Sequence, residues 1–209
     1  MDRRSQLLDT AEQACRAQGF DGFSYADLSA AVGIRKASIH HHFPTKADLA
    51  EAVIERYCEV FLRHLDAVAS RDGTAGERLR AYVDSYRTAL SGGESLCLCV
   101  AFSAGRASLS DPVLKRLNAF HADSAAWLTA VFEAGRRDGS IRAVGAPNHE
   151  ATACLALMEG AQLLARAACD VSLFDAATRS LLERTHRIDG AIPYVQGGRS
   201  SDANPTPTR

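Results

Sequence analysis

The 209-residue chain is long enough to form one large domain or two small ones, and its 46% hydrophobic and 23% charged residues are typical of a folded globular protein. Its formal net charge of -1 excludes bulk attraction to nucleic acid or membrane, so any polyanion would have to be bound by locally placed cations. The six cysteines follow no disulfide or zinc spacing, and no signal peptide or membrane-length apolar run is recognised. We therefore expect a cytoplasmic protein with reduced thiols.

Helical signals dominate the N-terminal part of the chain. Apolar residues recur at helical spacing over residues 7–15. Ser24 then begins a capping-box pattern for a short helix that Gly33 ends, and a second short helix is predicted over 36–42. Thr45 begins another capping box, which opens a long helix.

The remaining sequence predicts six longer helices. The first has an apolar stripe of Leu49, Val53, Tyr57, Val60, Phe61, His64, Leu65 and Val68. The others are expected to follow Thr74, to contain "LCLCVAFSAG", to begin near Pro112, and to span 148–169 and 173–187. Strand signals are weak, so we predict an all-α fold of about nine helices. The tail, residues 189–209, has the composition of a disordered segment.

Three consecutive histidines end the second short helix. Because successive helical residues are about 100° apart, His40, His41 and His42 cannot converge on one ion, so we expect no metal site. With Ile39 and Phe43 inward, the opposite face presents small, hydroxylic or cationic groups that suit a DNA groove. Two short helices joined by a glycine turn are also the helix-turn-helix arrangement. From composition alone, a solvated face on an ordinary helical bundle is an equal alternative.

The segment 7–53 resembles the N-terminal domain of TetR-family transcriptional regulators. The resemblance lies in the "AAVGI" turn, the aromatic-ended "ASIHHHF" helix and the "PTKADL" entry to the long helix. It implies a helix-turn-helix DNA-binding domain over 1–47 and an effector-binding and dimerisation domain over 48–188. It further implies a homodimeric repressor, released from a palindromic operator by a small organic ligand, with no cofactor.

The resemblance also implies which residues contact DNA: Arg3, Arg4, Ser24, Arg35, Lys36, Ala37, Ser38, His40, His41 and Lys46. Two of these depart from the family pattern. Arg35 replaces the small hydroxyl residue that usually caps the recognition helix. His40 replaces a tyrosine that touches the DNA backbone, which makes that contact sensitive to pH.

The larger domain is expected to hold the effector pocket and the dimer interface. Candidate pocket residues, a mixture of aromatic, apolar and a few polar groups, are Phe61, His64, Tyr82, Tyr86, Cys97, Phe102, His121, Trp127 and Glu159. The last two long helices are predicted to form the interface through Leu155, Leu157, Leu163, Leu164, Leu173, Leu181 and Leu182.

Three other functions compete with a ligand-released repressor. A thiol-sensing repressor would use Cys97 or Cys99, aided by Arg106; these two cysteines, two apart on one helix, are predicted to lie about 200° apart around its axis. An enzyme is disfavoured, because no nucleophile motif, phosphate loop or zinc-protease motif occurs. A helical adaptor without DNA binding is supported only by the neutral charge of the N-terminal domain and by Arg35.

Overall fold

The computed structural model describes residues 2–185 of the chain. Within that range the fold is all-α, as predicted, with nine α-helices and a single antiparallel bridge between Ile141 and Thr185 in place of any strand. The helices are α1 (Arg3–Gln18), α2 (Tyr25–Val32), α3 (Lys36–His42), α4 (Lys46–Ala69), α5 (Ala75–Ala89), α6 (Leu98–Ala104), α7 (Asp111–Asp138), α8 (Pro147–Ala168) and α9 (Ser172–Glu183). Two 3-10 turns, η1 (Ser91–Gly93) and η2 (Arg106–Ser108), flank α6. The predicted disordered tail lies outside the described residues.

Local capping determines where several helices begin. Ser24, Thr45 and Thr74 each accept a hydrogen bond from the backbone of the residue three positions later, whose carboxylate in turn accepts the cap's own N–H. All three predicted capping boxes are therefore confirmed. Gly33 ends α2 in the left-handed region, at φ 71°, where a side chain would be strained.

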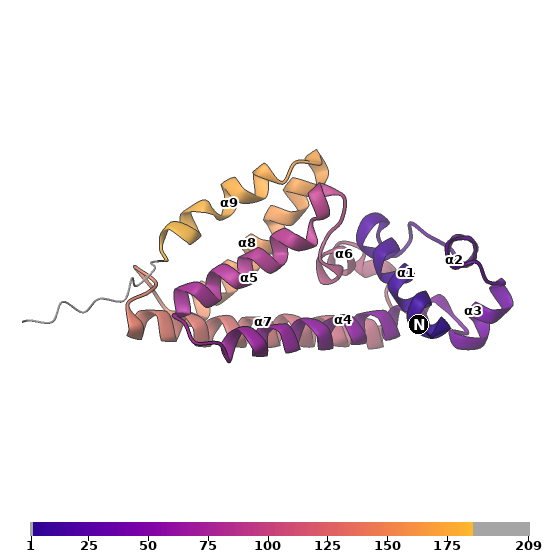
Figure 1. Ribbon diagram of the computed structural model, residues 1–209, viewed down its shortest axis with the longest axis horizontal. Coiled ribbons are helices and arrows are strands. Elements are labelled where there is room, and N and C mark those ends of the chain that lie inside the picture. The colour runs from indigo at the N-terminus through magenta and orange to yellow at the C-terminus, as the bar shows by residue number, and fades with distance from the viewer. Residues whose placement is uncertain (1, 186–209) are drawn as a thin grey trace, which may run out of the picture.

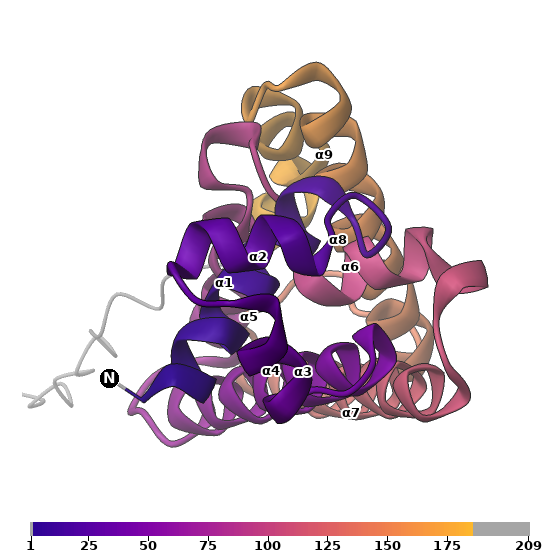
Figure 2. The ribbon, with the colours of Figure 1, turned by 90° about the vertical axis from the view of Figure 1, so that its right-hand side faces the viewer.

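The molecule consists of a helical head and a longer helical body. Helices α1 to α3 form the head, and α4 runs from it along the body beside α7 (Figure 1). Helices α5 and α8 cover this pair, and α9 packs on α8 at the far side. Seen from the head end, α3 lies on the side remote from α9 (Figure 2). One continuous cluster of buried apolar residues runs through both parts.

The last turn of α1 is attached to the body by direct hydrogen bonds. The Leu96 N–H donates to the Arg16 carbonyl at 3.0 Å. The Arg16 side chain donates back to the carbonyls of Leu96 and Ala89, at 2.8 and 2.9 Å. Arg166 of α8 donates to the Ala17 carbonyl at 2.8 Å. The orientation of the head therefore depends on how segment 89–97 and α8 are placed.

Among the described residues, no helix is both long and apolar enough to cross a membrane.

Candidate functional site

Helix α3 has one buried face and one exposed face, as its sequence predicts. Ile39 and Phe43 are 0% and 3% exposed, because they pack into the core of the head. His42 is exposed, and its ring centroid lies 6.4 Å from that of Phe43. The other exposed residues of this helix are Lys36, Ala37, Ser38, His40 and His41. The exposed face thus offers one ammonium, one hydroxyl and imidazole groups.

His40 is held in place by two contacts within the head. Its ring lies edge-on to that of Tyr25, with the centroids 4.9 Å apart. Its Nδ1 is 3.1 Å from the carbonyl oxygen of Pro44. Because a carbonyl only accepts, Nδ1 carries a proton in this contact, and Nε2 of the neutral ring is left as an acceptor. Neutral His40 therefore cannot donate from Nε2 to a DNA phosphate.

The remaining predicted DNA contacts differ in how free their side chains are. Arg3 and Arg35 are exposed, and the Arg4 guanidinium lies 5.4 Å from the Phe43 ring centroid. The Ser24 hydroxyl is committed to its capping box. Lys46 donates its ammonium to the Phe23 carbonyl at 2.5 Å and lies over the rings of Phe20 and Phe23. A phosphate would have to displace the Lys46 side chain from these contacts.

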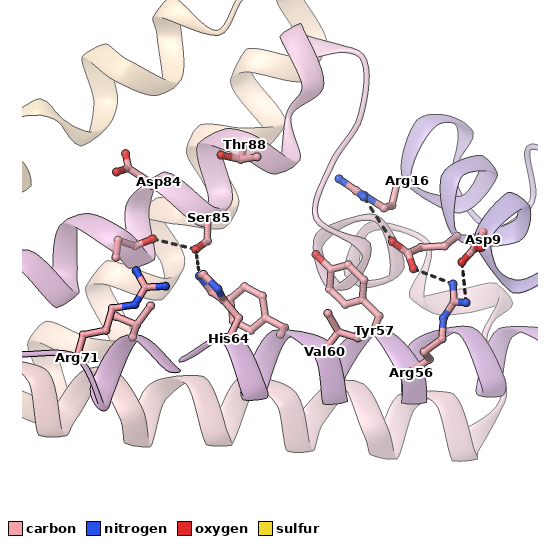
Figure 3. Close-up of a pocket in the computed structure, with 14 residues that line it drawn as sticks. Asp9, Arg16, Arg56, Tyr57, Val60, His64, Arg71, Asp84, Ser85 and Thr88 are labelled. Atoms are coloured by element: carbon pink, nitrogen blue, oxygen red, sulfur yellow. Dashed lines mark hydrogen bonds and ion pairs between the residues drawn. The ribbon is translucent and has the colours of Figure 1, made fainter. Parts of the chain in front are cut away.

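A groove of about 780 Å³ opens between α4 and α5 and reaches α1 (Figure 3). Val60 and His64, which the periodicity of α4 places in the buried stripe, are exposed along it; Val60 is 54% exposed. The predicted stripe is wrong at these two positions, because α4 and α5 pack loosely here. The full lining is Asp9, Glu12, Arg16, Arg56, Tyr57, Val60, Phe61, His64, Val68, Arg71, Ala81, Asp84, Ser85 and Thr88.

Hydrogen bonds fix the polar groups inside the groove. The Ser85 hydroxyl donates to the Ala81 carbonyl at 2.8 Å, so it accepts from Nε2 of His64 at 3.0 Å. At the head end, Arg56 lies 2.7 Å from Asp9 and 3.2 Å from Glu12. The groove therefore joins an aromatic and aliphatic wall to an ion-pair network on the head.

The predicted pocket residues divide between this groove and the interior. Phe61 and His64 line the groove. Tyr82, Tyr86, Cys97 and Phe102 are buried in the core, and His121, Trp127 and Glu159 are half-buried. The groove residues that the sequence did not single out, above all Arg16, Arg56 and Ser85, carry no local signal because they come from three separate helices.

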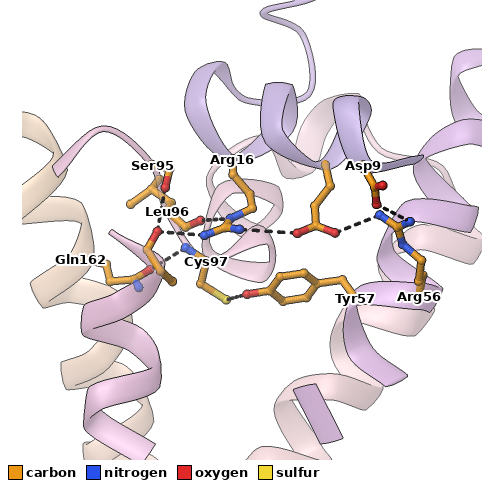
Figure 4. Close-up of polar contacts among 10 residues, drawn as sticks. Asp9, Arg16, Arg56, Tyr57, Ser95, Leu96, Cys97 and Gln162 are labelled. Atoms are coloured by element: carbon orange, nitrogen blue, oxygen red, sulfur yellow. Dashed lines mark hydrogen bonds and ion pairs between the residues drawn. The ribbon is translucent and has the colours of Figure 1, made fainter. Parts of the chain in front are cut away.

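Cys97 lies just before α6 and not on it, in an extended backbone conformation (φ -54°, ψ 139°). The predicted separation of about 200° between Cys97 and Cys99 is therefore wrong, since helical spacing does not apply. Tyr57 donates its hydroxyl to the Cys97 sulfur at 3.2 Å (Figure 4). Burial opposes ionisation of Cys97, but the neighbouring Cys99 thiol, the Tyr57 hydroxyl and the backbone N–H groups of α6 hold its pKa below the ordinary value. Arg106 is exposed on η2 and is not among these stabilising groups.

A half-buried ion pair joins α7 to α8. Nε2 of His121 lies 2.9 Å from Oε1 of Glu159. The Glu159 carboxylate raises the pKa of His121 above its ordinary value, against a smaller opposing effect of burial. Within residues 2–185, no three His, Cys, Asp or Glu side chains are grouped as a metal site requires.

The outer faces of α8 and α9 carry exposed apolar side chains. Leu163, Leu164 and Leu173 are 43%, 60% and 41% exposed. The other leucines predicted at the interface, Leu155, Leu157, Leu181 and Leu182, are buried or half-buried within the chain. Small residues between them, among them Ala156 and Gly160, are exposed and permit close approach of another helix.

Two family models match the chain. The model of bacterial regulatory proteins of the TetR family matches residues 7–53, and that of the tetracyclin repressor-like C-terminal domain matches residues 75–181. Among curated relatives, the HTH-type transcriptional repressor NemR of Escherichia coli strain K12 is 30% identical over 171 residues, which are 79% of this chain and 84% of NemR.

Solved structures show the same fold. A TetR-family transcriptional regulator from Agrobacterium tumefaciens superposes with a TM-score of 0.82 at 32% identity, covering 88% of this chain and 97% of that one. The reduced form of E. coli NemR superposes with a TM-score of 0.77 at 27% identity, covering 89% and 98%.

Proposed function

Since the chain belongs to the TetR family of bacterial regulatory proteins, which are DNA-binding transcriptional regulators and not enzymes, we propose that it is a repressor released from a palindromic operator by a small organic ligand. The similarity to the repressor NemR supports repression as the sign of regulation. Operator DNA is cytoplasmic in bacteria, and we place the protein there.

The main support for DNA binding is that α3 has one buried face and one exposed face. Ile39 and Phe43 fix the helix to the head, while Lys36, Ser38 and His41 remain outside and within one or two helical turns of each other. An ammonium and small polar groups at the start of an exposed helix suit base edges and phosphates in a major groove. Regulators of this family typically dimerise, and we propose that the exposed leucines of α8 and α9 form the interface.

A DNA titration tests this role. Duplex DNA flanking the protein's own coding region is compared with a scrambled duplex at about 150 mM salt, where weak nonspecific attraction is screened. The double variant Lys36→Ala and His41→Ala is expected to weaken binding to the specific duplex by about tenfold or more, since each base contact contributes about 1–3 kcal/mol. Lys115→Ala, which removes an exposed cation of the body on α7, is the matched control and leaves affinity unchanged. If this double variant bound the specific duplex as tightly as the wild type, α3 would not be the recognition helix.

We propose that the effector binds in the groove between α4 and α5. Its supporting features are the aromatic wall of Tyr57 and Phe61, whose rings stack at 6.5 Å, the exposed Val60, and the fixed polar pair of His64 and Ser85. The groove also touches α1, so a ligand there contacts both head and body. Binding would favour a state whose two heads are spaced wrongly for the operator.

A thiol-sensing repressor is the second candidate, and the surroundings of Cys97 support it. Its thiol accepts from Tyr57, which lines the groove, and two further buried cysteines, Cys99 and Cys58, lie in its neighbourhood. An alkylating agent such as iodoacetamide would reach the Cys97 thiolate past Tyr57, and the sulfur would displace iodide. We expect alkylation to abolish DNA binding by the wild type and by Cys154→Ser, and to leave DNA binding by Cys97→Ser intact. Equal inactivation of wild type and Cys97→Ser would exclude Cys97.

A further inference from the structure

The groove between α4 and α5 continues toward the head as a longer trough. An adjoining hollow of about 600 Å³ lies between α1, α5 and segment 91–95, and the two hollows share Arg16, Tyr57, Ser85 and Thr88. The Arg16 side chain extends from α1 across this trough to the body (Figures 3 and 4). A molecule lying along the trough would therefore meet the Arg16 guanidinium.

Arg16 is held mainly by neutral acceptors. Its Nε and Nη2 donate to the carbonyls of Leu96 and Ala89. Its carboxylate contact, with Glu12, is long at 3.4 Å, and the other oxygen of Glu12 is 3.2 Å from Arg56. Asp9 also forms an ion pair with Arg56, at 2.7 Å. The two acids of α1 are thus arranged mainly around Arg56, and Arg16 lacks a carboxylate that pairs closely with it.

We propose that the trough binds a singly charged organic acid, whose carboxylate pairs with Arg16. This proposal rests on the effector groove proposed above and names its ligand class. A carboxylate accepts two parallel bonds from a guanidinium and adds the attraction of opposite charges, which a neutral carbonyl lacks. An entering acid therefore competes effectively with the carbonyls of Ala89 and Leu96.

The walls of the trough define the rest of the ligand. Tyr57, Val60 and Phe61 provide an aromatic and aliphatic surface beside Arg16, which suits an apolar body. Four carboxylates, those of Asp9, Glu12, Asp84 and Glu94, line the trough against three guanidiniums, those of Arg16, Arg56 and Arg71. Because the acids outnumber the bases, further negative charge is repelled, and a dianion or a phosphate ester is disfavoured.

The same contact would transmit binding to the head. When Arg16 turns from the carbonyls of Ala89 and Leu96 to the ligand, α1 loses two of the bonds that attach its last turn to the body. The bonds from Leu96 N–H and Arg166 remain. Ligand binding and head position are thereby coupled through one side chain.

Titration calorimetry of the full chain tests the ligand class. The probes are 4-phenylbutanoate and 6-phenylhexanoate, each compared with its primary amide, which has nearly the same shape but no charge. The acids are expected to bind at least about tenfold more tightly than the amides, because only the acids carry a charge that pairs with Arg16. Arg16→Gln should abolish this preference while leaving amide binding unchanged, and Arg16→Lys should retain part of it.

Arg166→Gln is the matched control, because it removes another guanidinium bond to a carbonyl of α1 but does not line the trough. It should keep the full preference for acids. Equal binding of acids and amides, an unchanged preference in Arg16→Gln, or no binding of either acid would overturn the proposal. Operator binding without ligand is measured on the same samples. If operator binding is intact, only the ligand class fails; if it is absent, the proposed function itself fails.

Discussion

His40 illustrates how one hydrogen bond determines what a side chain can do for DNA. With Nδ1–H directed to the Pro44 carbonyl, the neutral ring offers DNA only an acceptor at Nε2, which phosphate oxygens do not complement. A tyrosine hydroxyl at this position can donate to a phosphate oxygen. We therefore expect His40→Tyr to raise operator affinity severalfold.

Fluorescence anisotropy with labelled duplex at fixed pH and ionic strength measures this change. His40→Phe, which keeps an aromatic ring but supplies no donor, should not gain affinity. His149→Tyr, which makes the same change at an exposed histidine of α8, serves as the control and should leave affinity unchanged. Unchanged or lower affinity of His40→Tyr would mean that this side chain does not face a phosphate.

Glu150 gives a second prediction at the scale of single residues. Its oxygens lie 2.9 and 3.0 Å from the two terminal nitrogens of Arg184, and this bond lowers the pKa of Glu150. Because the folded pKa lies below the unfolded value of about 4.3, the stabilisation is present above that pH and is lost as pH falls through the folded pKa. Glu150→Gln should lower the melting temperature by about 2–4 °C at pH 7. The difference in melting temperature, followed by circular dichroism, should shrink and disappear as pH falls through the folded pKa of Glu150.

The residue-level contacts show what the sequence cannot supply. Ser24, Thr45 and Thr74 are predictable because a capping box involves only four consecutive residues. The contacts of Lys46 with Phe20 and Phe23 depend instead on how the turn between α1 and α2 packs against the start of α4. Such contacts join residues more than twenty positions apart, so no local pattern reveals them.

Helix α3 begins without a side-chain cap, as α1 does. Arg35 occupies the N-cap position and makes no capping bond, whereas α2 and α4 have complete capping boxes. Arg35→Ser should stabilise the protein by about 1 kcal/mol, because serine accepts from a free backbone N–H at the helix start. The same change removes an exposed cation and should weaken DNA binding. Thermal unfolding and DNA titration of one variant measure both effects.

Thr45→Ala is the comparison for Arg35→Ser, since it removes a working cap from α4 and should destabilise by a similar amount. If Arg35→Ser leaves stability unchanged while Thr45→Ala lowers it, the start of α3 gains nothing from a side-chain cap. A gain in both stability and DNA affinity would exclude Arg35 as a DNA contact.

Element by element, the sequence predicts helices better than it predicts the spaces between them. The end of α3 follows from Pro44, and the start of α4 follows from its capping box. The exposure of Val60 and His64 does not follow, because α4 has the same periodicity whether or not α5 covers that side. Likewise, the extended backbone of Cys97 follows from the turn η1 and from the bond of its N–H to Gln162, a residue of α8.

At the scale of the whole molecule, the exposed leucines of α8 and α9 are the strongest evidence for assembly. Leu163, Leu164 and Leu173 lie on two neighbouring helices at the side of the body opposite α4. The family resemblance predicts a dimer interface on these helices, but only part of the predicted leucine set is exposed enough to take part. A two-fold interface would bring each leucine close to the same face of the partner.

Leu164→Glu is expected to convert the dimer to a monomer at micromolar concentration, because a two-fold interface would then bury two unpaired carboxylates. Val60→Glu provides a matched control: it places the same charge on another exposed apolar residue, in the groove on α4, and should remain dimeric. Sedimentation velocity distinguishes the two states. Since two heads must bind successive major grooves together, the Leu164→Glu monomer should also lose most of its affinity for a palindromic duplex while keeping the affinity for a half-site. A monomeric wild type, or a dimeric Leu164→Glu variant, would place the interface elsewhere.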